Sequence, residues 1–448
     1  MSRSEEAVVS HRAGTSAGRA GAARPSLFRA LRHRNFQLFF SGQMISLIGT
    51  WMDNIAEGWL VYRLTGSAVL LGTVSFAGQI PVFLLATLGG TMADRHNRRK
   101  IVIATQSTSM VLALTLAGLT LSGRIRVWEI VVLAALLGCV NAFDIPARQA
   151  FRVDMVGKED LINAIALNSS MFNGARIIGP AIAGILVASI GEGWCFFANG
   201  ISYIAVITGL LLMKLGPLAV ASREASPFEH AAEGFRFVRN TAPIRALLLL
   251  IALMSLVAMP YAVLMPIFAG DVYHRGARAL GWLMGATGIG ALLGALTLAT
   301  RRGVHGLGRW VAFASAGFAT CLILFASSQW FWLSLALLVP TGFCMMLQMS
   351  SCNTLIQSMV PDRLRGRVMA VYSMMFMGMA PIGALLAGIL AHHIGARWTV
   401  ILGGVVGLAG SAVFSLNLPA LRVEARELIV AQGLAGGEPA STMPPPRI

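Results

Sequence analysis

The sequence predicts an all-α membrane protein with twelve transmembrane helices in two pseudo-symmetric six-helix bundles, and three observations support this fold class. The 448 residues contain twelve apolar runs, each long enough for a helix to cross a hydrocarbon core, which takes roughly 20 residues. The basic residues fall on alternate connections between these runs. The second half of the chain also repeats a pattern of the first, as in carriers built from two parallel halves.

The twelve runs justify the helices in chain order. We expect spans at 36–62, 68–92, 101–122, 127–147, 163–189, 196–213, 244–269, 277–300, 308–326, 329–357, 367–391 and 398–417. One long polar stretch interrupts them and divides the spans into two groups of six. We therefore expect an N-terminal arm at 1–35, bundles at 36–213 and 244–417, a linker at 214–243 and a disordered tail at 418–448. The linker segment Phe228–Val238 is a candidate amphipathic helix.

The charge distribution predicts the orientation. With the N-terminus on the cytoplasmic side, that side collects 28 of the 35 Lys and Arg residues and the other side collects six. Such a bias over short loops follows the positive-inside rule, so we expect both termini in the cytoplasm. The net charge of +16 is explained by this topology, next to anionic lipid head groups, and we expect no nucleic-acid partner.

An internal echo supports a duplicated fold. GARIIGPAIAGIL begins at Gly174, and GMAPIGALLAGIL begins at Gly378, so that Gly184 corresponds to Gly388. Gly72 and Gly281 likewise open the second span of each half. Two such halves that rock about a midplane cavity can expose one site to either side of a membrane.

The loop after the second span carries the most specific motif, GGTMADRHNRRK from Gly89 to Lys100. It resembles the signature of the major facilitator superfamily at Gly90, Asp94, Arg95, Arg98, Arg99 and Lys100. Other stretches, including LNSSMFNGARIIGPAIAG from Leu167, are similar to the branch of enterobactin exporters and macrolide efflux proteins, which are drug:proton antiporters with twelve spans. The resemblance covers residues 28–417 and implies the major facilitator fold, in a cell inner membrane.

The same resemblance implies a cytoplasmic gate. A carboxylate at Asp94 suits a helix N-terminus, and Asp144 closes the fourth span on the same side. A relay of Asp94, Arg98 and Asp144 would latch the halves in the outward-open state, and which arginine pairs with Asp144 stays open. The alternative is that these charges only set topology.

The fifth span contains a small-residue motif. Gly174, Gly179, Pro180 and Gly184 resemble the antiporter motif of the superfamily, although Ala175 and Ala183 replace two of its glycines. Small residues allow close helix contact, and a proline permits a bend. Ordinary packing of membrane helices needs the same residues.

Three ionisable residues lie inside predicted spans: Asp53, Glu57 and Arg176. A charge near the bilayer centre costs at least about 2.5–3.5 kcal/mol, so such residues usually pair or face water. Asp53 and Glu57 share one helix face at a spacing of four residues. Their mutual repulsion should make one carboxylate hold a proton more readily, as a proton-coupled step requires. Arg176 is either their counter-charge or a binding group for an anionic substrate. The alternative is an ion pair that only fixes packing.

The first helix of each triplet lines the cavity in this superfamily. The candidates there are Gln43, Trp51, Asn141, Met259, Tyr261, Met265, Met345, Met346, Met349 and Asn353. Flexible thioethers suit bulky ligands of varied shape, although methionines at helical spacing are also common in plain cores.

We therefore expect a secondary active transporter, monomeric in the lipid bilayer, that exchanges protons for an amphiphilic small molecule such as a drug or siderophore. The chain contains no P-loop and no hydrolase or metalloprotease motif, so we expect neither an enzyme nor a cofactor. His392 and His393 are not expected to bind metal. The alternatives are uptake by proton symport and a polytopic protein that transports nothing.

Overall fold

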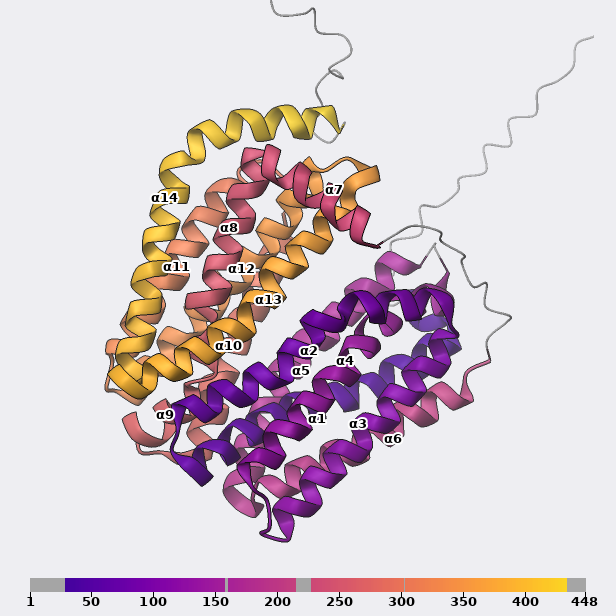
Figure 1. Cartoon of the computed structure of the whole chain (residues 1–448), viewed down its shortest axis with the longest axis vertical. Helices are drawn as coiled ribbons and strands as arrows, with labels where there is room; N and C mark the ends of the chain where they lie inside the picture. Colours follow the sequence, from indigo (N-terminus) through magenta and orange to yellow (C-terminus); the bar gives the residue numbers. More distant parts are fainter. Residues whose placement is uncertain (1–28, 158–159, 215–226, 302, 433–448) are drawn as a thin grey trace, which may run out of the picture.

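The computed structural model describes residues 29–157, 160–214, 227–301 and 303–432. The segments at 1–28 and 433–448, in the expected N-terminal arm and C-terminal tail, lie outside the described residues. The described chain is helical in two groups, which Figure 1 shows as two bundles inclined toward each other. The first bundle contains α1 (Arg34–Thr65), α2 (Ala68–Arg95), α3 (Arg98–Leu121), α4 (Val127–Val156), α5 (Leu161–Ile190) and α6 (Glu192–Leu212), preceded by the short helix η1 (Arg29–Arg32).

The second bundle repeats this plan. It begins with one membrane span over 242–272, divided into α8 (Ala242–Val257), η2 (Met259–Ala262), α9 (Met265–Ile267) and η3 (Phe268–Val272). It continues with α10 (Gly276–Ala299), α11 (Leu307–Ser327), α12 (Phe331–Met359), α13 (Asp362–Ile394) and α14 (Ala396–Ala431). The first span is broken because Pro260 and Pro266 have no backbone N–H to continue the helical hydrogen bonds.

Eleven helices in the described part of the chain are long and apolar enough to cross a membrane. The helix α1 is not among them, although its 32 residues would extend about 48 Å. Its interior carries Gln43, Asp53 and Glu57, which lower its apolar character. A helix that packs inside a bundle tolerates polar side chains that a lipid-facing helix does not, so α1 is the twelfth span.

Helix ends follow local sequence signals. Gly66 ends α1 with a φ of 60°, a left-handed conformation that glycine adopts without strain. Ser67 then accepts a hydrogen bond from the backbone N–H of Leu70 and caps α2. Asn97 caps α3 in the same way through the N–H of Lys100. These caps explain why only a few residues separate successive spans.

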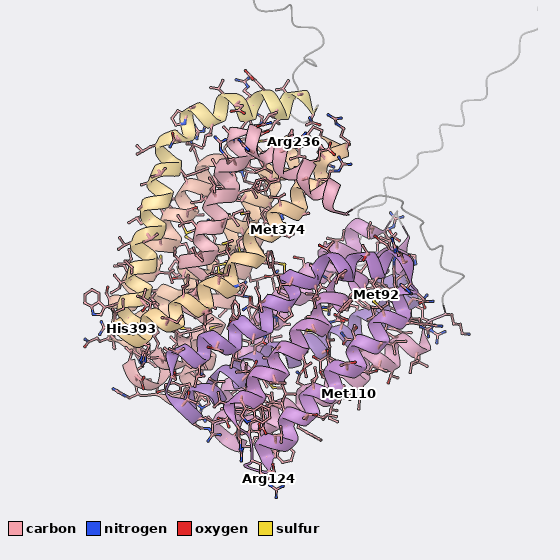
Figure 2. All side chains as sticks on the ribbon, in the orientation of Figure 1. Met92, Met110, Arg124, Arg236, Met374 and His393 are labelled. Atoms are coloured by element: carbon pink, nitrogen blue, oxygen red, sulfur yellow. The ribbon has the colours of Figure 1, made fainter. Side chains whose placement is uncertain are left out.

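Two ends of the molecule differ in charge. The basic face is the end that carries the α2–α3 connection, α7 (Pro227–Asn240) and the end of α14; the opposite face carries the α1–α2, α3–α4 and α13–α14 connections. Arg236 and Arg124 mark these two ends in Figure 2. On the basic face α7 packs against α13, where Glu233 forms an ion pair with Arg367.

One sequence expectation about the basic face changes. The candidate linker helix corresponds to α7, in which Val238 is buried and Phe235 is 55% exposed. The expected disordered tail is wrong for 418–431, because α14 continues to Ala431. The helix bends near Pro419 and crosses the end of its bundle (Figure 1). The apolar residues Leu421 and Ile429 pack against the bundle there, which explains why this segment is helical.

The bundles meet along two helix pairs, α2 with α13 and α5 with α10. Gly184 of α5 lies against Gly281 of α10, and Gly388 of α13 lies against Gly72 of α2. The two contacts use residues that correspond in the internal repeat, so the repeat accounts for both halves of the interface.

The bundles separate toward the basic face. Gly72, Phe83 and Gly90 follow one face of α2 at helical spacing. Gly72 contacts Gly388 and Phe83 contacts Gly378, whereas a Cβ atom built on Gly90 would meet no heavy atom within 4 Å. Figure 1 shows the same divergence, with the bundles close at the opposite face and apart near α7. The structure is therefore closed at the opposite face.

Candidate functional site

Arg176 lies between the two bundles. It projects from the middle of α5 and donates from Nη2 to the sulfur of Met345 on α12, at 3.9 Å. Its guanidinium carbon lies 5.7 Å from the ring centroid of Trp51 on α1, and Tyr261 of η2 lies within electrostatic range. Three residues predicted to line the cavity thus surround one cation, and they come from both halves of the chain.

Arg176 has no ion-pair partner among the described residues. The thioether of Met345 is a weak acceptor, and the face of Trp51 offers a cation–π contact. Neither neutralises the charge. The arrangement leaves a cation between the bundles that can pair with an anionic group.

Asp53 does not lie beside Arg176, as a counter-charge would. It is 6% exposed and lies inside the first bundle, where Asn199 of α6 is its polar neighbour. Its Oδ1 atom has no hydrogen-bond partner. One turn earlier on the same helix face, Gly49 packs against Asn199. The carboxylate therefore faces α6 and not Arg176.

Glu57 shares the face of Asp53, as its spacing predicts, and lies within electrostatic range of it. It is only half-buried, so it is the more accessible of the two carboxylates. Asn54, which the sequence interpretation missed, is exposed in the middle of α1. It lies one turn before Gly58, which contacts Pro266 of the other bundle. The signal in the sequence is an amide directly beside Asp53 in the middle of a predicted span.

The opposite face carries two polar contacts, one of which joins the bundles. The hydroxyl of Tyr62 on α1 donates to Oδ1 of Asp271 on η3 at 2.5 Å. Arg63 pairs at 2.7 Å with Glu192 at the start of α6, within the first bundle. Asp271 belongs to a π-helical turn, a local irregularity often found at functional sites. None of these residues was predicted, because no local motif relates positions so far apart in the chain.

The predicted gate residues do not form the relay of Asp94, Arg98 and Asp144 in this state. Arg98 pairs with Asp154, with Nη1–carboxylate distances of 3.0 and 3.1 Å. Asp154 was not a predicted partner because the fourth span was expected to end at 147, whereas α4 continues to Val156. Asp94 is exposed and takes part in no ion pair within the described chain.

Asp144 is instead buried inside the first bundle. It is 2% exposed, accepts hydrogen bonds from Thr105 and Gln106, and pairs with Arg148 one turn along α4 at 3.0 Å. Of the remaining loop residues, Arg99 donates to the carbonyl of Leu211, while Arg95 is exposed.

The small-residue motif of α5 serves two neighbours. Gly179 packs against α1 at Trp51, Pro180 lies within the helix, and Gly184 contacts Gly281 of the other bundle. Gly174 has nothing within 4 Å of a Cβ built on it, so packing does not require glycine there.

The remaining predicted cavity residues divide between several environments. Met259, Met345 and Met349 line a hollow of about 10 Å³ within the second bundle, together with Gln348 and Phe376. Met346 faces Gly294 of α10, and Met265 is fully buried. Gln43 is buried with an unpartnered Oε1 atom. Asn141 is half-buried, and Asn353 accepts a hydrogen bond from Gln357.

Comparison with known proteins decides the family. A family model described as a transmembrane secretion effector of the major facilitator type matches residues 25–438. The chain belongs to this family. Its major facilitator fold is shared with a mutant of the nucleoside transporter NupG, with a TM-score of 0.66 and 11% identity over 88% of this chain and 100% of that one. A bacterial Spinster homologue in an inward-facing, unoccupied conformation gives a TM-score of 0.62 and 14% identity, over 89% and 98%.

Curated relatives of this major facilitator protein align over most of both chains. A staphyloferrin A transporter of Staphylococcus aureus is 28% identical and covers 84% of this chain and 94% of its own length. A multidrug efflux pump Tap of Mycolicibacterium fortuitum is 28% identical, with 79% and 88% covered. An enterobactin exporter EntS of Shigella boydii is 25% identical, with 88% and 93% covered.

Proposed function

We propose that this protein exports an amphiphilic small molecule, a drug or a siderophore, in exchange for protons by alternating access. The observation that carries the proposal is the match to a secretion family across both bundles. Relatives named as a multidrug efflux pump and an enterobactin exporter support export of such compounds. The unpaired cation at Arg176 between the bundles supports a binding site at their interface.

The charge bias supports a cytoplasmic location for the basic face, and the bacterial relatives support a place in the cell inner membrane. In that orientation the structure is closed to the outside and separates toward the cytoplasm, the state in which an exporter loads substrate. The outward-open state then requires release of the Tyr62–Asp271 contact and closure around Gly90, where the relay of Asp94, Arg98 and Asp144 is proposed to form.

Asp53 and Glu57 are the proposed proton carriers. Asp53 has an unpartnered carboxylate oxygen inside the bundle, and carboxylates within membrane spans commonly mark proton relays. The half-buried Glu57 connects this site to the interface, because it lies one turn beyond the exposed Asn54. Arg176, with no carboxylate paired to it, is proposed to contact an anionic group of the substrate.

Proton coupling is tested in inverted membrane vesicles with an imposed proton gradient. Addition of a transported macrolide or catecholate siderophore should dissipate the gradient, and Asp53→Asn should abolish this response while retaining substrate binding. The matched control is Glu192→Gln, which changes a carboxylate of the same bundle that is paired with Arg63; it should leave coupling intact.

Three outcomes contradict parts of the proposal. If both Asp53→Asn and Glu57→Gln still dissipate the proton gradient when substrate is added, these two residues are not the proton carriers. Substrate accumulation in right-side-out vesicles, driven by an inward proton gradient, indicates uptake by symport. If neither the proton gradient nor the substrate distribution responds to any drug or siderophore tested, the protein does not transport these classes of compound.

A further inference from the structure

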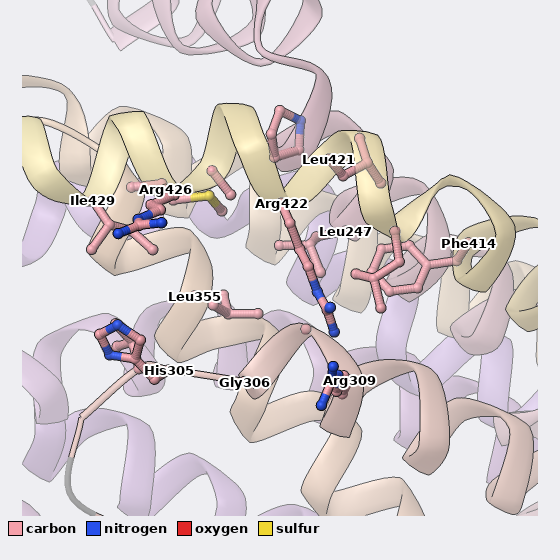
Figure 3. Close-up of a pocket in the computed structure, with 16 residues that line it drawn as sticks. Leu247, His305, Gly306, Arg309, Leu355, Phe414, Leu421, Arg422, Arg426 and Ile429 are labelled. Atoms are coloured by element: carbon pink, nitrogen blue, oxygen red, sulfur yellow. The ribbon is translucent and has the colours of Figure 1, made fainter. Parts of the chain in front are cut away.

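A cavity of about 520 Å³ lies at the basic face of the second bundle, away from the site between the bundles. It is enclosed by the final turns of α14, the starts of α8 and α11, and the end of α12 (Figure 3). Its volume is within the roughly 300–1,000 Å³ typical of small-molecule sites. The cavity is lined by Pro243, Leu247, Val304, His305, Gly306, Gly308, Arg309, Leu355, Met359, Phe414, Leu418, Leu421, Arg422, Ala425, Arg426 and Ile429.

The extension of α14 forms one wall of the cavity. Beyond the bend at Pro419, two series at four-residue spacing face the cavity: Leu421, Ala425 and Ile429, and beside them Arg422 and Arg426. The acidic residues of this segment are not among the lining residues. The helix therefore presents cations and apolar side chains together to the cavity.

The cavity carries uncompensated positive charge. Arg309 and Arg422 point toward one another, and Arg426 and His305 lie beside the same space (Figure 3). No acidic residue lines the cavity, and the three arginines form no ion pair within the described residues. Like charges that face each other across a partly enclosed space repel unless an anion lies between them.

The start of α11 adds to this field. Gly306 precedes the helix with no side-chain cap, and the first turn contains no acidic residue, so the positive end of the helix dipole is uncompensated. The approach to α11 is ordered by Arg301, which donates to the carbonyl of His305 at 2.7 Å and lies 4.3 Å from the ring centroid of Trp310. These contacts tie Arg301 to the residues on both sides of the first turn of α11.

We propose that this cavity binds an anionic phospholipid of the cytoplasmic leaflet. The phosphate lies among Arg309, Arg422 and Arg426, and the acyl chains follow the apolar wall at Leu247 and Leu418. Basic pockets at the cytoplasmic ends of membrane helices suit such head groups. The apolar residues favour a lipid over a free phosphate, which needs no apolar wall. The proposal requires a cytoplasmic basic face but does not depend on what the protein transports.

The test uses the full-length protein, delipidated in detergent and titrated with phosphatidylglycerol, phosphatidylcholine or inorganic phosphate. Binding is measured by native mass spectrometry and by the unfolding temperature. The variant Arg309→Gln/Arg422→Gln should weaken binding of phosphatidylglycerol by about 30-fold, from about 1 kcal/mol for each basic residue near an anionic head group. The matched control, Arg236→Gln/Arg363→Gln, removes two exposed charges from the basic face outside the cavity and should bind as the wild type does.

A third variant examines the apolar wall. Leu418→Asn leaves the arginines in place and should weaken phosphatidylglycerol binding while leaving any binding of inorganic phosphate unchanged. If the cavity variant Arg309→Gln/Arg422→Gln and the control variant Arg236→Gln/Arg363→Gln lose the same affinity for phosphatidylglycerol, the proposal is overturned in favour of attraction by general surface charge. Equal binding of phosphatidylcholine, or displacement of phosphatidylglycerol by millimolar phosphate, would also overturn it, the latter in favour of a free-anion site.

Discussion

Gly184 of α5 packs directly on Gly281 of α10, so that a Cβ atom at position 184 would lie 3.0 Å from the Cα atom of Gly281. The counterpart residues of the repeat, Gly388 and Gly72, make the same kind of contact between α13 and α2. These two backbone contacts hold the bundles together at the opposite face. A side chain at either point must separate the bundles.

Gly184→Val should therefore destabilise the state that is closed at the opposite face and abolish substrate export from cells at unchanged protein level. Its control is Gly174→Ala in the same helix, where an added Cβ meets nothing within 4 Å and export should persist. Normal export by Gly184→Val would mean that this contact opens without consequence.

Loss of the Tyr62 hydroxyl should also favour the outward-open state. Tyr62→Phe removes the hydrogen bond to Asp271, and a contribution of about 1 kcal/mol corresponds to a roughly fivefold change in the ratio of the two states. The reporter is Met374→Cys on α13, a position that is 46% exposed here, in a background where the five native cysteines are replaced. An impermeant maleimide applied at the basic face should modify this cysteine more slowly in Tyr62→Phe than in the parent protein.

Asp271→Asn is the matched control for Tyr62→Phe, because its amide oxygen still accepts the hydrogen bond. Its labelling rate should lie near that of the parent protein. If both variants behave like the parent, the contact does not hold the opposite face closed.

Asp144 should be a stability residue in this state. Asp144→Ala leaves Arg148 and the side chains of Thr105 and Gln106 without their shared acceptor. Removal of one partner of a buried ion pair costs about 3–5 kcal/mol, so the unfolding temperature in detergent should fall clearly. Arg148→Ala should cost less in the background of Asp144→Ala than alone, because the pair is already broken. Additive losses would show that the two residues act independently.

The sequence predicted the fold well because its signals are local or periodic. Apolar length, caps such as Ser67 and the echo between Gly184 and Gly388 each depend on short stretches of chain, and together they determine twelve spans and two halves. The end of α14 escaped prediction because its helical state depends on tertiary packing of Leu421 and Ile429 under the bundle, which composition does not reveal.

The candidate site was predicted only in part, for a related reason. The resemblance implied that Trp51, Tyr261 and Met345 line a cavity, and its depth in a span marked Arg176 as a counter-charge or an anion-binding group. That these four residues lie together was not predicted. Helix rotation was not determined by those signals, and Asp53 is directed toward α6, away from Arg176. Contacts between bundles, such as Tyr62 with Asp271, lie between distant segments of the chain and have no sequence pattern.

Arg176 makes the most specific prediction about substrate class. Because this cation lies at the interface between bundles and has no ion-pair partner among the described residues, Arg176→Gln should weaken export of carboxylate siderophores more than export of cationic drugs. We expect a rise of about tenfold or more in KM for the anionic compounds, since loss of one partner of a desolvated charge pair costs about 2 kcal/mol or more. Arg176→Lys retains the charge but loses the planar guanidinium over the ring of Trp51, so an intermediate KM follows. Met345→Leu, which removes the sulfur acceptor at similar volume, should leave the preference between anionic and cationic substrates unchanged. An equal effect of Arg176→Gln on both classes would assign this arginine to bundle packing instead of substrate recognition.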